Sequence, residues 1–136
     1  MWIDKQLLLA NNQAPTNTGD TDTENVIDLV KRGGSNDVLA AFVLVTESVT
    51  SAGAATVQFT LKHSNDGSNW TTIATTAAIA KGSLTAGTVM LAACLPKDLY
   101  RYVKGTFTIG TAALSSGKFH VSLVKDVQTN VVPVAY

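Results

Sequence analysis

The sequence predicts an all-β protein: an antiparallel β-sandwich of jelly-roll type, with about eight strands and with extended N- and C-terminal arms. Short apolar stretches recur between turn residues along the 136-residue chain, and only 15% of its residues are charged. Thr, Ser, Ala and Val make up much of the remainder. Because β-branched side chains fit a pleated sheet and crowd a helix, this composition favours strands.

The clearest strand is expected at residues 55–64, where apolar and polar positions alternate. This alternation places one face of the strand on a core and the other in water. The core face comprises Ala55, Val57, Phe59, Leu61 and His63. Residues 70–76 are the expected hairpin partner, because Asn65-Asp66-Gly67 between them is a strong hairpin signal.

The other strands are expected at 25–30, 39–47, 88–95, 99–110 and 119–125. Residues 39–47, LAAFVLVTE, are almost continuously apolar, which predicts a central strand covered on both faces. Within 99–110, Gly105 shares a face with apolar residues and is expected to mark a β-bulge. Pro133 restricts the ending NVVPVAY to a short edge strand.

One domain with two arms is predicted: residues 1–24 as N-terminal arm and polar spacer, 25–127 as the sandwich, and 128–136 as the C-terminal arm. Residues 10–24 hold little that could enter a core, so they are expected to be an extended or mobile segment. The alternative is an N-terminal strand against an edge of the fold.

The apolar chain ends are expected to contact a partner protein. Exposed apolar segments mark interfaces, and extended arms can add a strand to a neighbour's sheet. The predicted contact residues are Trp2, Ile3, Leu7, Leu8, Leu9, Val131, Val132, Pro133 and Tyr136.

Charge and motifs exclude several classes of function. Ten basic and ten acidic residues give a net charge of +0, without the basic cluster that direct binding to nucleic acid requires. No apolar run approaches the ~20 residues of a membrane span, so no membrane contact is expected. The chain has no nucleophile elbow, phosphate loop or dinucleotide fingerprint, and no acids at i and i+2 of a predicted strand. We therefore expect neither catalytic activity nor a cofactor.

His63 and His120 lie in predicted strands with no second ligand at metal-binding spacing. Both are expected to be satisfied by hydrogen bonds or to face solvent. Since His120 alternates with Phe119 and Val121, it should point to the face opposite theirs.

Residues 64–73, SNDGSNWTTI, could form a turn, a calcium loop or a sugar site. A calcium loop needs an acid at its twelfth position, and the two possible registers place Thr76 or Ala77 there. The turn is therefore preferred, and no metal is expected. A sugar site stays an alternative, because aromatic rings can stack on carbohydrate; its predicted platform is Trp70, Tyr100 and Tyr102.

Several segments carry a resemblance to a known family: MWIDKQLLL followed by NNQA, then TENVIDLV, LPKDLYRYVKGTFTIGT, SSGKFHVSLVKD and a final PVAY. Together they resemble the capsid cement (decoration) proteins of tailed bacteriophages. The matching positions are Pro96, Arg101, Tyr102, Gly117, Asp126, Pro133 and Tyr136. The DGSNW segment departs from this pattern, since the family often has a simple loop there.

The resemblance implies a jelly-roll protein that binds the outer surface of an icosahedral capsid and bridges adjacent major capsid protein subunits. It also implies a homo-oligomer, a dimer in preference to a trimer, that is made in the host cytoplasm and located on the virion. Such a protein needs contact area repeated over many symmetric copies rather than catalysis. The alternative function is a carbohydrate-binding or host-attachment module on the virion.

Overall fold

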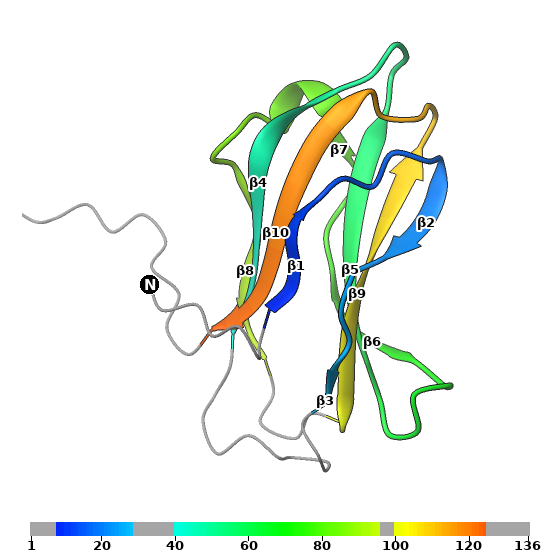
Figure 1. The fold of residues 1–136 in the computed structure, drawn as a ribbon, viewed down its shortest axis with the longest axis vertical. Helices are drawn as coiled ribbons and strands as arrows, with labels where there is room; N and C mark the ends of the chain where they lie inside the picture. Colours follow the sequence, from blue (N-terminus) through cyan, green and yellow to red (C-terminus); the bar gives the residue numbers. More distant parts are fainter. Residues whose placement is uncertain (1–7, 29–39, 96–99, 125–136) are drawn as a thin grey trace, which may run out of the picture.

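Two antiparallel sheets pack face to face in the computed structural model, which describes residues 8–28, 40–95 and 100–124 (Figure 1). Sheet A has the order β1-β10-β4-β8, formed by Leu8–Gln13, Ser116–Val124, Ala40–Thr50 and Val89–Cys94. Sheet B has the order β2-β9-β5-β6, formed by Gly19–Asp22, Tyr102–Gly110, Thr56–Ser64 and Thr71–Thr75. Two short strands complete sheet B: β3 (Ile27–Asp28) pairs with β9, and β7 (Ile79–Ala80) pairs with β5.

The chain crosses between the sheets at β1–β2, β3–β4, β4–β5, β7–β8, β8–β9 and β9–β10. Repeated crossing of this kind is the topology of a jelly roll, so the predicted fold class is confirmed. Within the described ranges, the helical structure is limited to a three-residue 3-10 turn, η2 (Lys81–Ser83).

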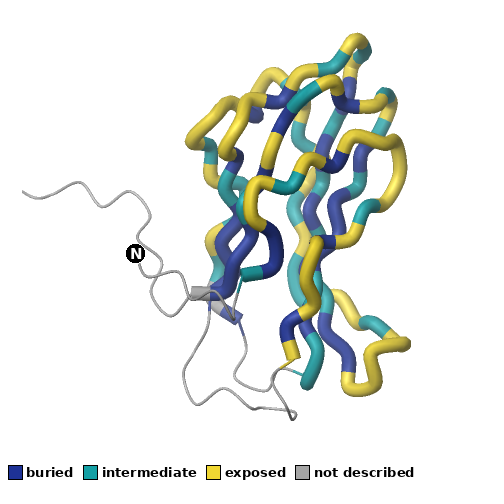
Figure 2. Tube along the Cα trace, viewed as in Figure 1, coloured by how far each residue is buried: buried dark blue, intermediate teal, exposed yellow. Residues whose placement is uncertain are grey.

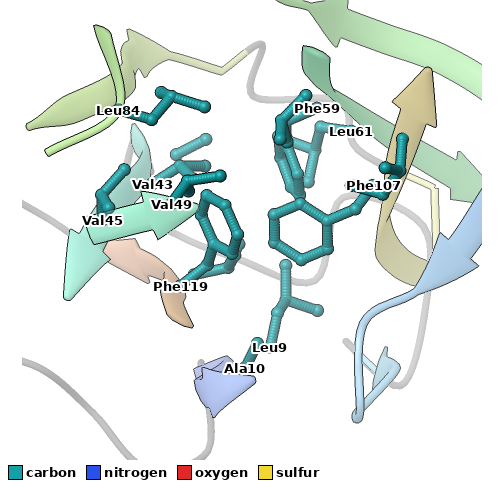
Figure 3. Close-up of a cluster of buried hydrophobic side chains, with 14 of the residues drawn as sticks. Leu9, Ala10, Val43, Val45, Val49, Phe59, Leu61, Leu84, Phe107 and Phe119 are labelled. Atoms are coloured by element: carbon teal, nitrogen blue, oxygen red, sulfur yellow. The ribbon is translucent and has the colours of Figure 1, made fainter. Parts of the chain in front are cut away.

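The core between the sheets is built around three phenylalanines that are fully buried. The ring centroids of Phe59 (β5) and Phe107 (β9) are 5.1 Å apart, and those of Phe107 and Phe119 (β10) are 4.8 Å apart. Tilted contacts at these distances are favourable between aromatic rings. Figure 3 shows Phe119 reaching from sheet A toward the two rings of sheet B, so this cluster ties the layers together.

The alternation predicted for β5 and the coverage predicted for β4 are both confirmed. On β5, Val57, Phe59 and Leu61 are fully buried and the residues between them are half-buried (Figure 2). On β4, Ala41, Val43 and Val45 belong to the main core. On the opposite face of β4, Ala40 and Phe42 form a second buried cluster with Leu44. Sheet A is thus apolar on both sides of its central strand.

Residues 8–22 correct the predicted boundary between arm and sandwich. Strand β1 pairs with β10 at one edge of sheet A, and β2 pairs with β9 at one edge of sheet B. The sandwich therefore includes residues from Leu8 onward, and the edge-strand alternative holds for this segment. Composition is misleading here because an edge strand pairs through its backbone and needs few apolar side chains. Residues 1–7 of the predicted N-terminal arm, and all of the predicted C-terminal arm at 128–136, lie outside the described residues.

Gly105 does not mark the expected bulge. The pairing of β9 with β5 runs without a register shift through Leu61 and Gly105. A Cβ atom at this position would overlap the ring of Phe59 and lie 2.9 Å from Cγ2 of Thr23. Glycine is needed here because the buried Phe59 ring occupies the space where a side chain would start.

Candidate interaction surfaces

The outer face of sheet B is polar, and its groups bind one another. The hydroxyls of Thr106 and Thr108 donate hydrogen bonds to Asp22 and Asp20 at 2.9 and 2.8 Å, respectively. Nζ of Lys104 donates to Oδ2 of Asp22 at 3.1 Å. Burial alone would raise the pKa of Asp22, but the hydrogen bonds from Lys104 and Thr106, together with the positive charges of Lys104 and Lys62, lower that pKa. These contacts fix the edge strand β2 on β9.

The loop at residues 65–70 is a turn closed on Asp66, and β5 and β6 form the predicted hairpin around it. Oδ1 of Asp66 accepts hydrogen bonds from the backbone N–H groups of Ser68 and Asn69, both at 2.8 Å, and from the hydroxyl of Ser64 at 2.9 Å. These bonds hold the pKa of Asp66 far below its ordinary value, and the bond from the backbone N–H of Asn69 has the largest effect. Gly67 has a φ of 77°, which glycine adopts without strain.

The carboxylate of Asp66 therefore acts as an acceptor within its own turn. In the three described ranges, no group of three His, Cys, Asp or Glu side chains lies close enough to hold a metal ion.

Trp70 and Tyr102, two of the three aromatic residues predicted as a sugar platform, share the outer face of sheet B. Tyr102 and Lys104 alternate with the buried Val103, so both point outward. Nζ of Lys104 lies 4.4 Å from the ring centroid of Trp70, and Cζ of Arg101 lies 4.9 Å from that of Tyr102. Both rings thus carry a cation of their own chain on one face, at a distance typical of cation–π contacts.

Tyr100, the third predicted ring, lies on the other side of the sheet. It stacks on His63, with ring centroids 4.0 Å apart and an interplanar angle of 6°. The backbone N–H of Tyr100 donates to Nδ1 of His63 at 3.2 Å. Because His63 is buried on the same side of β5 as Leu61, the predicted three-ring platform is not formed on one face. The expectation that His63 is satisfied by hydrogen bonding is confirmed.

Long-range contacts of this end of sheet B have no signal in the local sequence. Arg101 and Asp28, separated by 73 residues, form two hydrogen bonds of 2.7 and 3.0 Å that join β3 to the start of β9. The contact of Trp70 with Lys104 likewise joins residues far apart in the chain. Only the strand order of the folded sheet brings such pairs together.

His120 points to the outer face of sheet A, opposite Phe119, but it does not face solvent as the sequence allowed. It is half-buried beside Leu44, and Ser122 next to Phe42 is fully buried. Among the described residues, Nε2 of His120 and Oγ of Ser122 are buried without a hydrogen-bond partner. Burial lowers the pKa of His120. This face therefore differs from the hydrogen-bonded outer face of sheet B.

The predicted contact residues at the N-terminus divide into two groups. Leu8 is half-buried and pairs with Ser122 at the start of β1. Leu9 is fully buried in the main core and points toward the phenylalanine rings (Figure 3). Leu9 is thus a core residue rather than a partner contact, which corrects the prediction. The other predicted contacts lie outside the described residues: Trp2, Ile3, Leu7, Val131, Val132, Pro133 and Tyr136.

The fold defines the class of this protein, a jelly-roll β-sandwich. The chain belongs to the Bbp16 family, which matches residues 9–123 and thus nearly all of both sheets. This family is associated with phages, and membership indicates a phage structural protein located in the virion. No curated protein matches the chain. The described residues form no helix that is long and apolar enough to cross a membrane.

Proposed function

We propose that this chain binds the outer surface of an icosahedral phage capsid as a homo-oligomer and cements neighbouring major capsid protein subunits. In this role it stabilises the shell against the pressure of packaged DNA. The role depends on contacts alone and requires neither a catalytic step nor a cofactor.

The observation that carries the proposal is the match to a phage-associated family over residues 9–123. The position of the described chain ends supports it. Leu8 pairs with Ser122, two residues before β10 ends at Val124. The apolar segments that precede β1 and follow β10 therefore start from the same end of sheet A. Both can reach one partner surface from there.

Weak contacts can hold such a protein on a shell. A capsid repeats the same surface many times, and two linked contacts bind far more tightly than either alone, because the second forms within an existing complex. The jelly roll supplies a rigid body, and the chain ends supply separate contacts on that body.

The experiment is co-sedimentation with purified capsids of the phage that encodes the protein. The full chain should bind at a fixed ratio to the major capsid protein. Deleting residues 1–7 leaves β1 intact, so this variant should keep its unfolding transition and lose at least about tenfold in affinity. Deleting residues 131–136 should have the same effect.

Two results would contradict the proposal. If the full chain does not sediment with capsids, the cement function is wrong. If both shortened chains bind with the affinity of the full chain, the terminal segments are not the contacts. Deletion of residues 1–9 is not a suitable variant, because it removes Leu9 from the core.

The carbohydrate-binding alternative is motivated by Trp70 and Tyr102 on the outer face of sheet B. The chain has two tryptophans, so a Trp2→Phe variant makes Trp70 the only indole reporter. Under the cement proposal, titration with a panel of glycans should leave the fluorescence of this variant unchanged. Saturable quenching that Trp70→Ala abolishes would favour the alternative.

A further inference from the structure

Strand β8 is an edge of sheet A without a second neighbour in the described structure. It pairs with β4 alone (Figure 1). This pairing has one register shift, between Val43 and Leu44, and is regular from Leu91 to Cys94, with Leu91 opposite Val43 and Cys94 opposite Ala40. The strand, VMLAAC, has no charged residue and no proline. Natural edge strands usually carry such residues, or bulges, because an open edge can pair with another chain.

The other edges of the two sheets are protected more strongly than β8, which has one register shift and no charged residue. Strand β1 pairs with two register shifts and contains Asn12 at a φ of 54°. Strand β2 carries Asp20 and Asp22, which would place like charges together if two copies met there. At the other edge of sheet B, β6 is a polar strand, TTIAT. Strand β8 is therefore the apolar edge of the described sandwich.

The side chains of β8 have apolar surface that the chain itself leaves uncovered. Val89 is 42% exposed, and with Val26 it is one of two exposed large hydrophobic residues in the described ranges. Met90 and Leu91 pack against the main core but are only half-buried. A further strand beside β8 would remove this surface from water.

We propose that β8 pairs antiparallel with β8 of a second copy across a two-fold axis, joining the two copies of sheet A into one continuous sheet. A two-fold interface must be complementary to itself, and an uncharged strand meets this condition without like-charge contacts. The net charge of +0 adds no long-range repulsion between copies. Such pairing uses both open edges and ends there, which prevents further growth.

This inference rests on the proposed function, which requires a homo-oligomer, but its test uses no capsid. Ala92 is exposed on β8, and Thr72 is exposed on β6 at the edge of the other sheet. Sedimentation equilibrium of the full chain should give twice the monomer mass of 14.2 kDa. Ala92→Lys and Ala92→Glu should each give the monomer mass at the same concentration. The matched control Thr72→Lys should stay dimeric.

Mixing Ala92→Lys with Ala92→Glu should restore the dimer mass, because opposite charges then meet across the seam. Restoration also shows that both variants are folded. The inference is overturned if the unmodified chain is monomeric or trimeric at about 100 μM, if Ala92→Lys remains dimeric, or if the mixture stays monomeric. If the chain forms a β8-dependent dimer but does not bind capsids, only the cement function is contradicted. If the chain is a monomer that binds capsids, only this interface is contradicted.

Discussion

Gly105→Ala tests whether the packing of Phe59 requires glycine on the neighbouring strand. The added Cβ would overlap the Phe59 ring, which is fully buried and lies 5.1 Å from the ring of Phe107. Thr23 blocks a second direction, since its Cγ2 would lie 2.9 Å from the new atom. Overpacking a core that cannot move aside costs about 1–3 kcal/mol, and we expect about 3 kcal/mol here.

Urea denaturation followed by tryptophan fluorescence measures this loss. With a slope of about 2 kcal/mol/M, the midpoint should fall by about 1.5 M. The matched control is Gly82→Ala in the exposed turn η2, where a Cβ would meet no atom within 4 Å. That change should be neutral or stabilise by up to about 1 kcal/mol. The packing argument fails if Gly105→Ala unfolds at the wild-type midpoint, or if both variants lose the same stability.

Three further changes test other parts of the fold. Leu9→Ala should lower the free energy of unfolding by about 2–5 kcal/mol, because it empties a fully buried site. Leu8→Ala should cost clearly less in the same urea titration. Equal losses would mean that Leu9 is not a core residue. Asp66→Ala should speed hydrogen exchange of the backbone amide of Asn69, measured by NMR. Asp66→Asn should speed this exchange less, because it keeps one acceptor oxygen. Unchanged exchange in both variants would mean that Asp66 does not close the turn. Because burial lowers the pKa of His120, the unfolded chain takes up this proton first as the pH falls below about 6.5. Stability should therefore drop between pH 7.5 and 5.5, less steeply in His120→Gln, and identical slopes would contradict the argument.

The parts of the fold that could be predicted from sequence are those set by neighbouring residues. The alternation along β5 and the Asn-Asp-Gly turn specify a hairpin, because side-chain period and turn conformation act over a few positions. The apolar run of β4 specified a strand covered on both faces for the same reason. Resemblance to a phage family and the match to Bbp16 agree on a phage association.

Edges and pair contacts required the folded chain. β2 has no apolar residue, and only the first half of β1 is apolar. The place of both strands in the sheets depends on backbone pairing with β10 and β9, which lie about a hundred positions away along the chain. The role of Gly105 depends on a ring from the neighbouring strand, which no local pattern reveals.

The sequence by itself thus determined that this protein is an all-β chain of alternating strands and tight turns with apolar ends, because hydrophobic period and turn chemistry are local properties. Tertiary structure alone decided that Leu9 lies in the core, that Trp70 and Tyr102 share a face without Tyr100, and that β8 is an uncharged edge. Each of these depends on strand order and on which side of a sheet a residue occupies. Those properties arise only when strands distant in sequence are placed side by side.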